Sequence, residues 1–280
     1  MLEILKTIIL GIVQGITEWL PISSTGHLIL VNRLLPLQQS QDFMNLFLVI
    51  IQFGSILAVL TLYFHKLNPF SPKKSKEQKL ETWTMWFKVI AAVLPAAIIG
   101  FLFDDLIEST LSVPFVIALT LILYGILFII IEKQNRTPKI NDISAMSYKT
   151  AILIGAFQVL ALIPGTSRSG STILGAVILG ASRGIAAEFS FFLAIPVMFG
   201  ASLLRTLKFF LENGFSMAPD AAWILVIGTA VSYLVSLAAI RFLVGYIRKH
   251  NFVAFGYYRI VLGILVLIYF AVTGGLFTLA

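Results

Sequence analysis

The chain has 280 residues, of which 59% are hydrophobic and 12% are charged, and its mean hydropathy is +0.97. A soluble domain carries about twice this share of charged residues, so the composition excludes an ordinary soluble protein. The net charge of +7 does not indicate nucleic-acid binding, because most lysines and arginines lie in short loops between apolar runs, as in membrane proteins. The absence of cysteine excludes disulfides and thiolate chemistry.

The first region of the chain, at about residues 1–40, predicts two short apolar helices joined by a polar loop. The loop reads EWLPISSTGH and occupies residues 18–27, between apolar residues on both sides. Irregular polar backbone at membrane depth is tolerated only where protein or a water-filled cavity surrounds it. We therefore expect a re-entrant helical hairpin at about 1–40, with its loop buried inside the protein.

Six longer runs with few charges are typical of membrane-spanning helices, which need about 20 apolar residues each. The expected spans lie at about 43–64, 84–103, 112–132, 186–208, 221–241 and 255–277. Basic and acidic loops alternate between them, and the basic loops are expected in the cytoplasm. This orientation places both termini outside and favours a site that opens to the outer, periplasmic side.

A second predicted re-entrant hairpin, at about 148–183, resembles the first. Its loop contains PGTSRSGST at 164–172, and Gly, Gln, Pro, Ser and Gly recur in the same order as before. We interpret the chain as one membrane domain, 1–280, with an inverted-repeat architecture made of repeats at 1–104 and 148–245. Inverted repeats with broken helices usually hold a binding site near the membrane midplane, where the repeats meet.

The first loop contains the groups needed for proton transfer and nucleophilic attack. Gln14 and Glu18 are four residues apart, so both project from one helix face. Glu18 is expected to accept a proton or to hold a divalent cation, and His27 to act as general acid or base. Ser24, or alternatively Ser23, is the candidate nucleophile.

Both loops are expected to bind an anion, because helix N-termini with hydroxyl-rich turns favour negative charge. Arg168 adds a planar fork suited to phosphate oxygens. The expected binding residues are Gln14, Ser23, Thr25, Gly165, Thr166, Ser167, Ser169 and Thr172. Gln52 and Glu188 occupy matching places in the two repeats. They are expected to lie outside the ligand-binding residues and to support them. Taken singly, Glu18 and Arg168 could form a structural ion pair, but together these intramembrane polar residues indicate a functional site.

The two loops also identify a family resemblance. QGITEWLPISSTGH at 14–27, PGTSRSGST at 164–172 and EFSFFLAIP at 188–196 resemble the signature regions of the undecaprenyl-diphosphate phosphatase family, the bacitracin-resistance proteins. The resemblance implies a multi-pass enzyme of the bacterial inner membrane that removes the terminal phosphate of undecaprenyl diphosphate. The product, undecaprenyl phosphate, is the lipid carrier recycled in cell-wall synthesis. A divalent cation, Mg²⁺ or Ca²⁺, is implied as a cofactor.

The resemblance also implies roles for individual residues. The acidic motif of the family falls on Gln14 and Glu18, its essential histidine on His27 and its essential arginine on Arg168. Its loop serines fall on Ser23, Ser24, Ser167 and Ser169. Many relatives have glutamate at position 14, so this chain's Gln14 leaves Glu18 as the one carboxylate for a metal.

Several matters remain open at the level of sequence, among them whether Ser24 or a water in its place attacks, which metal acts and which prenyl chain length is preferred. A lipid flippase or secondary transporter would use the same pocket to carry a phosphate group across the membrane. The spaced elements of the unrelated membrane acid phosphatases are absent. The oligomeric state, including a homodimer, is also open.

Overall fold

The computed structural model describes residues 1–214 and 218–278, without the side chains of residues 104, 105 and 108. Within this part of the chain the regular elements are helices, which confirms the predicted all-α polytopic fold. The helices are α1 (Leu2–Thr17), α2 (Ser24–Leu34), α3 (Gln41–Leu62), α4 (Phe64–Leu67), α5 (Lys76–Leu111), α6 (Pro114–Lys133), α7 (Tyr148–Val159), the 3₁₀ turn η1 (Leu160–Leu162), α8 (Arg168–Ile178), α9 (Arg183–Asn213), α10 (Pro219–Ile247) and α11 (Val253–Thr273).

Six of the described helices are long and apolar enough to cross a membrane, as predicted. They are α3, α5, α6, α9, α10 and α11. The helix of the second span begins before the predicted start at about residue 84, because α5 already starts at Lys76. Ser75 and Gln78 form a capping box there, in which each side chain bonds the backbone N–H of the other residue. The helix therefore extends beyond its apolar segment.

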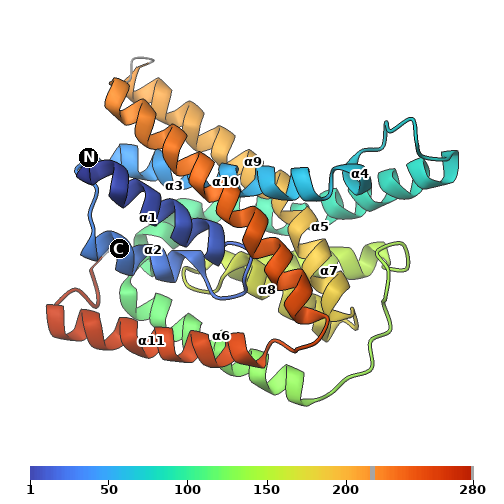
Figure 1. Ribbon diagram of the computed structural model, residues 1–280. Coiled ribbons are helices and arrows are strands. Elements are labelled where there is room, and N and C mark those ends of the chain that lie inside the picture. The colour runs from blue at the N-terminus through green and yellow to red at the C-terminus, as the bar shows by residue number, and fades with distance from the viewer. Residues whose placement is uncertain (215–217, 279–280) are drawn as a thin grey trace.

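Each region predicted as a hairpin contains two short helices joined by an irregular loop, α1 with α2 and α7 with α8, and their re-entry into the membrane stays a prediction. The long helices pack beside them and against one another: α1 packs along α10, α7 along α5, α3 against α9 and α10, and α6 against α11 (Figure 1). These contacts keep the same pattern when each helix is exchanged with its counterpart, in the pairs α1/α7, α3/α9, α5/α10 and α6/α11. The α1–α10 contact then becomes the α5–α7 contact. The α3–α9 and α6–α11 contacts join the two members of a pair and are unchanged. This packing favours the inverted repeat, which stays a prediction.

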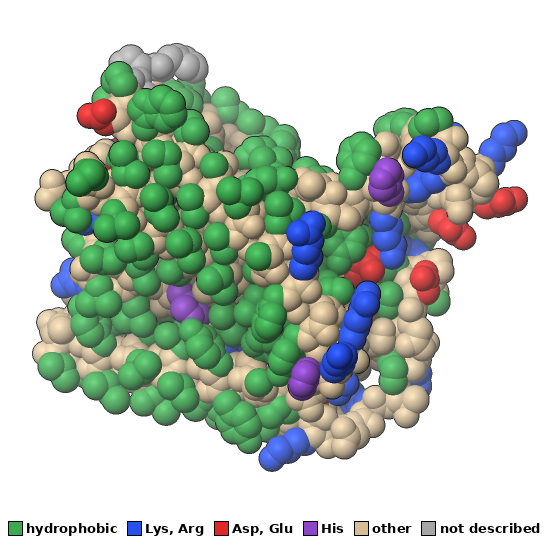
Figure 2. Space-filling view, in the orientation of Figure 1, with side chains coloured by type: hydrophobic (Ala, Val, Ile, Leu, Met, Phe, Trp, Pro, Cys, Tyr) green, Lys and Arg blue, Asp and Glu red, His purple; other side chains and the backbone are tan. Residues whose placement is uncertain are grey.

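The basic loops lie at one end of the molecule. Figure 2 shows Lys and Arg side chains gathered toward the end that contains α4 and the start of α5, whereas hydrophobic side chains cover much of the remaining face. Lys88 joins two of these loops, because its ammonium group donates to the carbonyl oxygens of Ile143 and Ser144. A shared basic end agrees with the positive-inside pattern of the sequence.

The contact between α7 and α5 depends on Gly155. A Cβ atom added there would lie 1.9 Å from the carbonyl oxygen of Ala92, a backbone atom that cannot turn aside. We expect Gly155→Ala to lower the free energy of unfolding by about 1–3 kcal/mol, the usual cost of overpacking. Thermal unfolding in detergent measures this effect. Gly200→Ala is the matched control, because a Cβ there meets no atom within 4 Å and a helical alanine is favoured over glycine; equal melting temperatures for the two variants would contradict this packing.

Candidate active site

The first loop is built by an unusual start of α2. Helix α1 ends at Thr17, Glu18 follows as its C-cap, and Ser23 is the N-cap of α2. Ser23 has φ 73°, a region that residues other than glycine rarely adopt, and its Oγ accepts the N–H of Gly26 at 3.3 Å. A sharp, strained turn at Ser23 therefore comes directly before the first turn of α2 and its backbone N–H groups.

The second loop has the same local geometry. Ser167 is the N-cap of α8, also with φ 73°, and its Oγ accepts the N–H of Gly170 at 3.1 Å. Gly165 precedes it with φ 87°, and a Cβ there would lie 2.5 Å from the carbonyl oxygen of Ile117. Two helix N-termini with matching caps are thus available to a negative charge.

The carboxylate of Glu18 is the centre of the site. Its Oε1 accepts a hydrogen bond from Arg168 Nη2 at 3.1 Å, and its Oε2 accepts from Ser24 Oγ at 3.1 Å and from Gln14 Nε2 at 3.0 Å. The Glu18 residue is only 6% exposed. The fold therefore brings together four predicted site residues from α1, α2 and α8.

Arg168 is held by groups that the sequence did not indicate. Its Nη1 donates to the carbonyl oxygen of Ser190 in α9 at 2.8 Å, and its guanidinium lies over the ring of Trp19, 5.5 Å from the centroid. Trp19 itself is fully buried and packs edge-on against Phe191. The plane and direction of the arginine fork are thereby set before any ligand binds.

The structure does not place the predicted support residues Gln52 and Glu188 in hydrogen-bonding contact with the two loops, within the described residues. Glu188 forms an ion pair with Lys66, and no hydrogen bond joins Gln52 to either loop within the part of the chain that the structure describes. Ser190, two residues after Glu188, is the residue that contacts Arg168. Residues two apart on a helix point in nearly opposite directions, so Glu188 and Ser190 cannot face the same loop.

Several predicted binding residues instead hold the loops together. Ser169 Oγ lies 3.1 Å from the carbonyl oxygen of Glu18, to which it donates, so it ties the second loop to the first. Thr172 donates to the Arg168 carbonyl oxygen at 2.9 Å and lies 2.6 Å from Ser190 Oγ. Thr25 is exposed and bonds none of these residues.

His27 is present at the site but bonds neither Glu18 nor Ser24. Its Nδ1 lies 2.7 Å from the carbonyl oxygen of Ser23, and its Nε2 lies 2.6 Å from the hydroxyl of Tyr258 in α11. The expectation that His27 exchanges a proton directly with the candidate nucleophile has no support in this geometry. The carboxylate of Glu18 is the basic group in contact with Ser24.

Arg259 of α11 is a central residue that the sequence analysis missed. It is fully buried, and its guanidinium donates to the carbonyl oxygens of Pro21 at 3.2 Å, Gly165 at 3.0 Å and Thr166 at 2.9 Å. It therefore joins both loops and turns these carbonyl groups toward itself. The sequence signal was weak, because an arginine only four residues into the predicted span at 255–277 can also reach the membrane interface.

Four buried polar atoms around the site lack a hydrogen-bond partner among the described residues. They are Gln14 Oε1, Trp19 Nε1, Thr166 Oγ1 and Arg168 Nε. Such atoms cost about 1–3 kcal/mol each when nothing satisfies them, so a polar ligand or water that bonded them would be stabilised here. No group of three or more His, Asp or Glu side chains forms a ready metal site within the described ranges.

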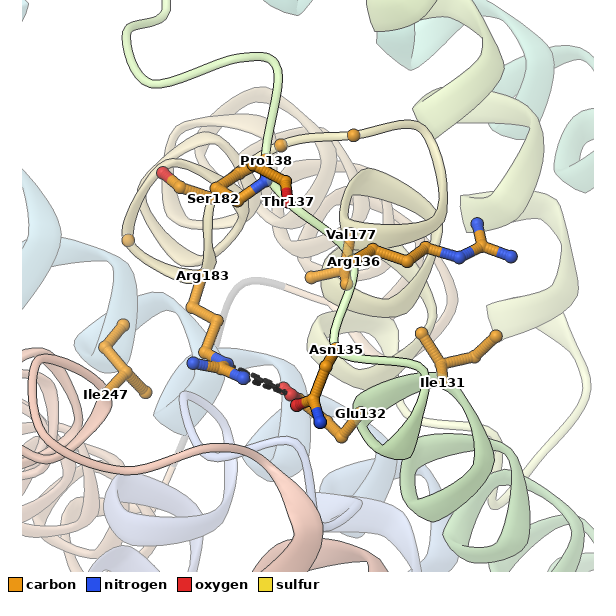
Figure 3. Close-up of a pocket in the computed structure, with 13 residues that line it drawn as sticks. Ile131, Glu132, Asn135, Arg136, Thr137, Pro138, Val177, Ser182, Arg183 and Ile247 are labelled. Carbon is orange, nitrogen blue, oxygen red and sulfur yellow. Dashed lines mark hydrogen bonds and ion pairs between the residues drawn. The ribbon is translucent and has the colours of Figure 1, made fainter.

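A separate pocket of about 280 Å³ lies at the end of α6, away from the two loops (Figure 3). Arg183 and Glu132 face each other there, and Arg183 Nη2 lies 2.6 Å from Glu132 Oε2. Glu132 also accepts the backbone N–H of Phe252. This bidentate pair is satisfied internally and joins α6, α9 and the start of α11.

The fold and site define an integral membrane protein that brings a serine, a buried carboxylate and a guanidinium together beside two helix N-termini, an arrangement suited to phosphoryl groups. A family model described as bacitracin resistance protein BacA matches residues 7–265, and the chain belongs to this family.

Several similar curated proteins are named undecaprenyl-diphosphatase. The chain is 56% identical to one from Limosilactobacillus fermentum over 97% of this chain and 99% of the relative. It is 56% identical to one from Enterococcus faecalis over 94% of this chain and 96% of the relative. It is 57% identical to undecaprenyl-diphosphatase 1 of Clostridioides difficile over 96% of this chain and 97% of the relative.

Proposed function

We propose that this chain is an undecaprenyl-diphosphatase that removes the terminal phosphate of undecaprenyl diphosphate within the membrane. The observation that carries the proposal is the contact of one carboxylate, Glu18, with both a hydroxyl and a guanidinium, Ser24 and Arg168. The names of the near full-length relatives support the same reaction. The product would supply the lipid carrier of cell-wall synthesis, and removal of the diphosphate would confer bacitracin resistance.

In the proposed mechanism, Arg168 and the free N–H groups at the starts of α2 and α8 hold the diphosphate. Ser24 Oγ gives its proton to Glu18 and attacks the terminal phosphorus. The bond from this phosphorus to the bridging oxygen breaks, and the lipid monophosphate leaves with the electron pair. Water then hydrolyses the phosphoserine, which releases inorganic phosphate and restores Ser24.

A divalent cation, Mg²⁺ or Ca²⁺, is part of the proposal. Glu18 is the carboxylate that would hold the ion, and the unpartnered Gln14 Oε1 beside it would supply a second oxygen donor. Mg²⁺ commonly binds one or two carboxylates and completes its coordination with substrate phosphate and water. The oxygen atoms of Glu18 and Gln14 fit an ion shared between protein and substrate. Its charge would offset that of the diphosphate. Arg168 bonds the other oxygen, Oε1, of the Glu18 carboxylate.

The direct test is phosphate release from a C15 or C55 prenyl diphosphate by purified protein in detergent, with and without EDTA. A detergent solution has no second compartment, so release there separates hydrolysis from flipping or transport. We expect release that EDTA abolishes and that added Mg²⁺ or Ca²⁺ restores. Absence of release with either cation would refute the proposed reaction, and EDTA-resistant release would refute the cation alone.

Ser24→Ala tests the attacking group. We expect phosphate release to fall by about 100-fold or more, because the nucleophile is lost while the anion-binding groups remain. Rapid quenching of wild-type turnover should also trap a phosphoserine at position 24. Near-normal activity of Ser24→Ala, with no phosphoserine trapped during wild-type turnover, would show that water attacks directly.

We also propose that the protein lies in the inner membrane with its site open to the periplasmic side. The support is the gathering of basic side chains at one end of the molecule, which the positive-inside bias places in the cytoplasm. Intact cells should then hydrolyse a short-chain prenyl diphosphate added outside, and hydrolysis only after membrane disruption would reverse this orientation.

A further inference from the structure

The hydroxyl of Tyr258 approaches His27 from α11, a helix outside both loops. The oxygen lies 2.6 Å from His27 Nε2, and the two rings are stacked with an interplanar angle of 8°. Tyr258 is 46% exposed, yet a hydrogen bond at membrane depth has little water to compete with it. The contact therefore joins α2 to α11 at the edge of the site.

The other nitrogen of His27 determines which tautomer is present. Nδ1 lies 2.7 Å from the Ser23 carbonyl oxygen, which can only accept, so Nδ1 must carry a proton. In the neutral ring Nε2 then has no proton and accepts the hydrogen bond of the Tyr258 hydroxyl. The two contacts together define the Nδ1–H tautomer and fix the plane of the imidazole.

This chain of hydrogen bonds ends on the peptide unit of the proposed nucleophile. The Ser23 carbonyl shares a planar trans peptide with the Ser24 N–H, so the two groups point in opposite directions. Holding the carbonyl against His27 directs the Ser24 N–H away from it and stabilises the strained φ of Ser23. Tyr258 thus influences the orientation of Ser24 without contacting it.

We propose that Tyr258 is a positioning residue, which holds His27 in the Nδ1–H tautomer and through it sets the Ser23–Ser24 peptide for attack on the phosphate. This inference rests on the proposed phosphatase function for its kinetic part, whereas its tautomer part stands on the geometry alone. In this proposal His27 orients the backbone of the first loop, and Glu18 takes the proton of Ser24.

The test compares Tyr258→Phe with Tyr257→Phe. Tyr257 is the matched control, because it neighbours Tyr258 on α11, is 55% exposed and makes no side-chain hydrogen bond among the described residues. With a C15 prenyl diphosphate, we expect Tyr258→Phe to lower kcat by about five- to tenfold, the effect of one hydrogen bond, with KM little changed. Tyr257→Phe should keep the wild-type kcat.

The tautomer is measured by ¹⁵N NMR of histidine-labelled protein in detergent micelles. The chain has three histidines, and the signals of His27 are those lost in His27→Gln. We expect the wild type to show a protonated Nδ1 and an unprotonated, hydrogen-bonded Nε2, and Tyr258→Phe to shift the Nε2 signal. A wild-type Nε2–H tautomer, unchanged signals in Tyr258→Phe or a wild-type kcat for that variant would each overturn the proposal. Loss of phosphate release in the wild type, with the expected tautomer present, would refute the phosphatase function and leave the hydrogen-bond chain intact.

Discussion

Glu18→Gln is expected to lower kcat for phosphate release by about 100- to 10,000-fold, the usual effect of removing a general base. The amide keeps the shape of the side chain and can still accept from Arg168 Nη2, but it cannot take the proton of Ser24. The variant should therefore fold and still bind the diphosphate. Initial rates with a C15 prenyl diphosphate, together with a thermal melt in detergent, check both expectations.

Glu188→Gln is the matched control for this effect. Glu188 also pairs with a cation, Lys66, but it faces away from the loops. Its substitution should leave kcat within about threefold of wild type, as expected for a partly exposed pair that is worth about 0–1 kcal/mol. A Glu18→Gln enzyme with activity similar to that of Glu188→Gln would remove Glu18 from the mechanism.

Arg168→Lys is the second substitution with a large expected effect, about 100-fold or more in kcat/KM. The arginine donates through Nη2 to Glu18 and through Nη1 to Ser190 while its plane lies over Trp19. A lysine ammonium is a single point of charge and cannot reproduce these three contacts together. The loss should be concentrated in the reaction, because a developing phosphate charge depends on oriented donors.

Arg183→Lys provides the comparison for Arg168→Lys. Arg183 also forms a close arginine–carboxylate pair, with Glu132, but at the pocket beside α6. We expect lower thermal stability and near-normal kcat/KM in that variant. If the two substitutions had equal effects on kcat/KM, the loss would reflect general destabilisation.

Much of this protein follows from local sequence patterns. The apolar runs determine the six long helices, because an uncharged segment of about 20 residues has no other stable arrangement in a bilayer. The repeated Ser-x-x-Gly pattern determines the two N-caps, since a serine hydroxyl and a glycine amide three residues apart bond within one turn. The i and i+4 spacing likewise places Gln14 beside Glu18.

The contacts between distant segments were decided only by the tertiary structure. The sequence predicted that Glu18 and Arg168 share a site, but it did not show that Ser190 would hold the guanidinium in place of Glu188. It also did not indicate that α11 reaches both loops through Arg259 and His27 through Tyr258. Which face of a long apolar helix meets a given loop depends on how all the helices pack together, and no local pattern along α9 or α11 specifies that rotation.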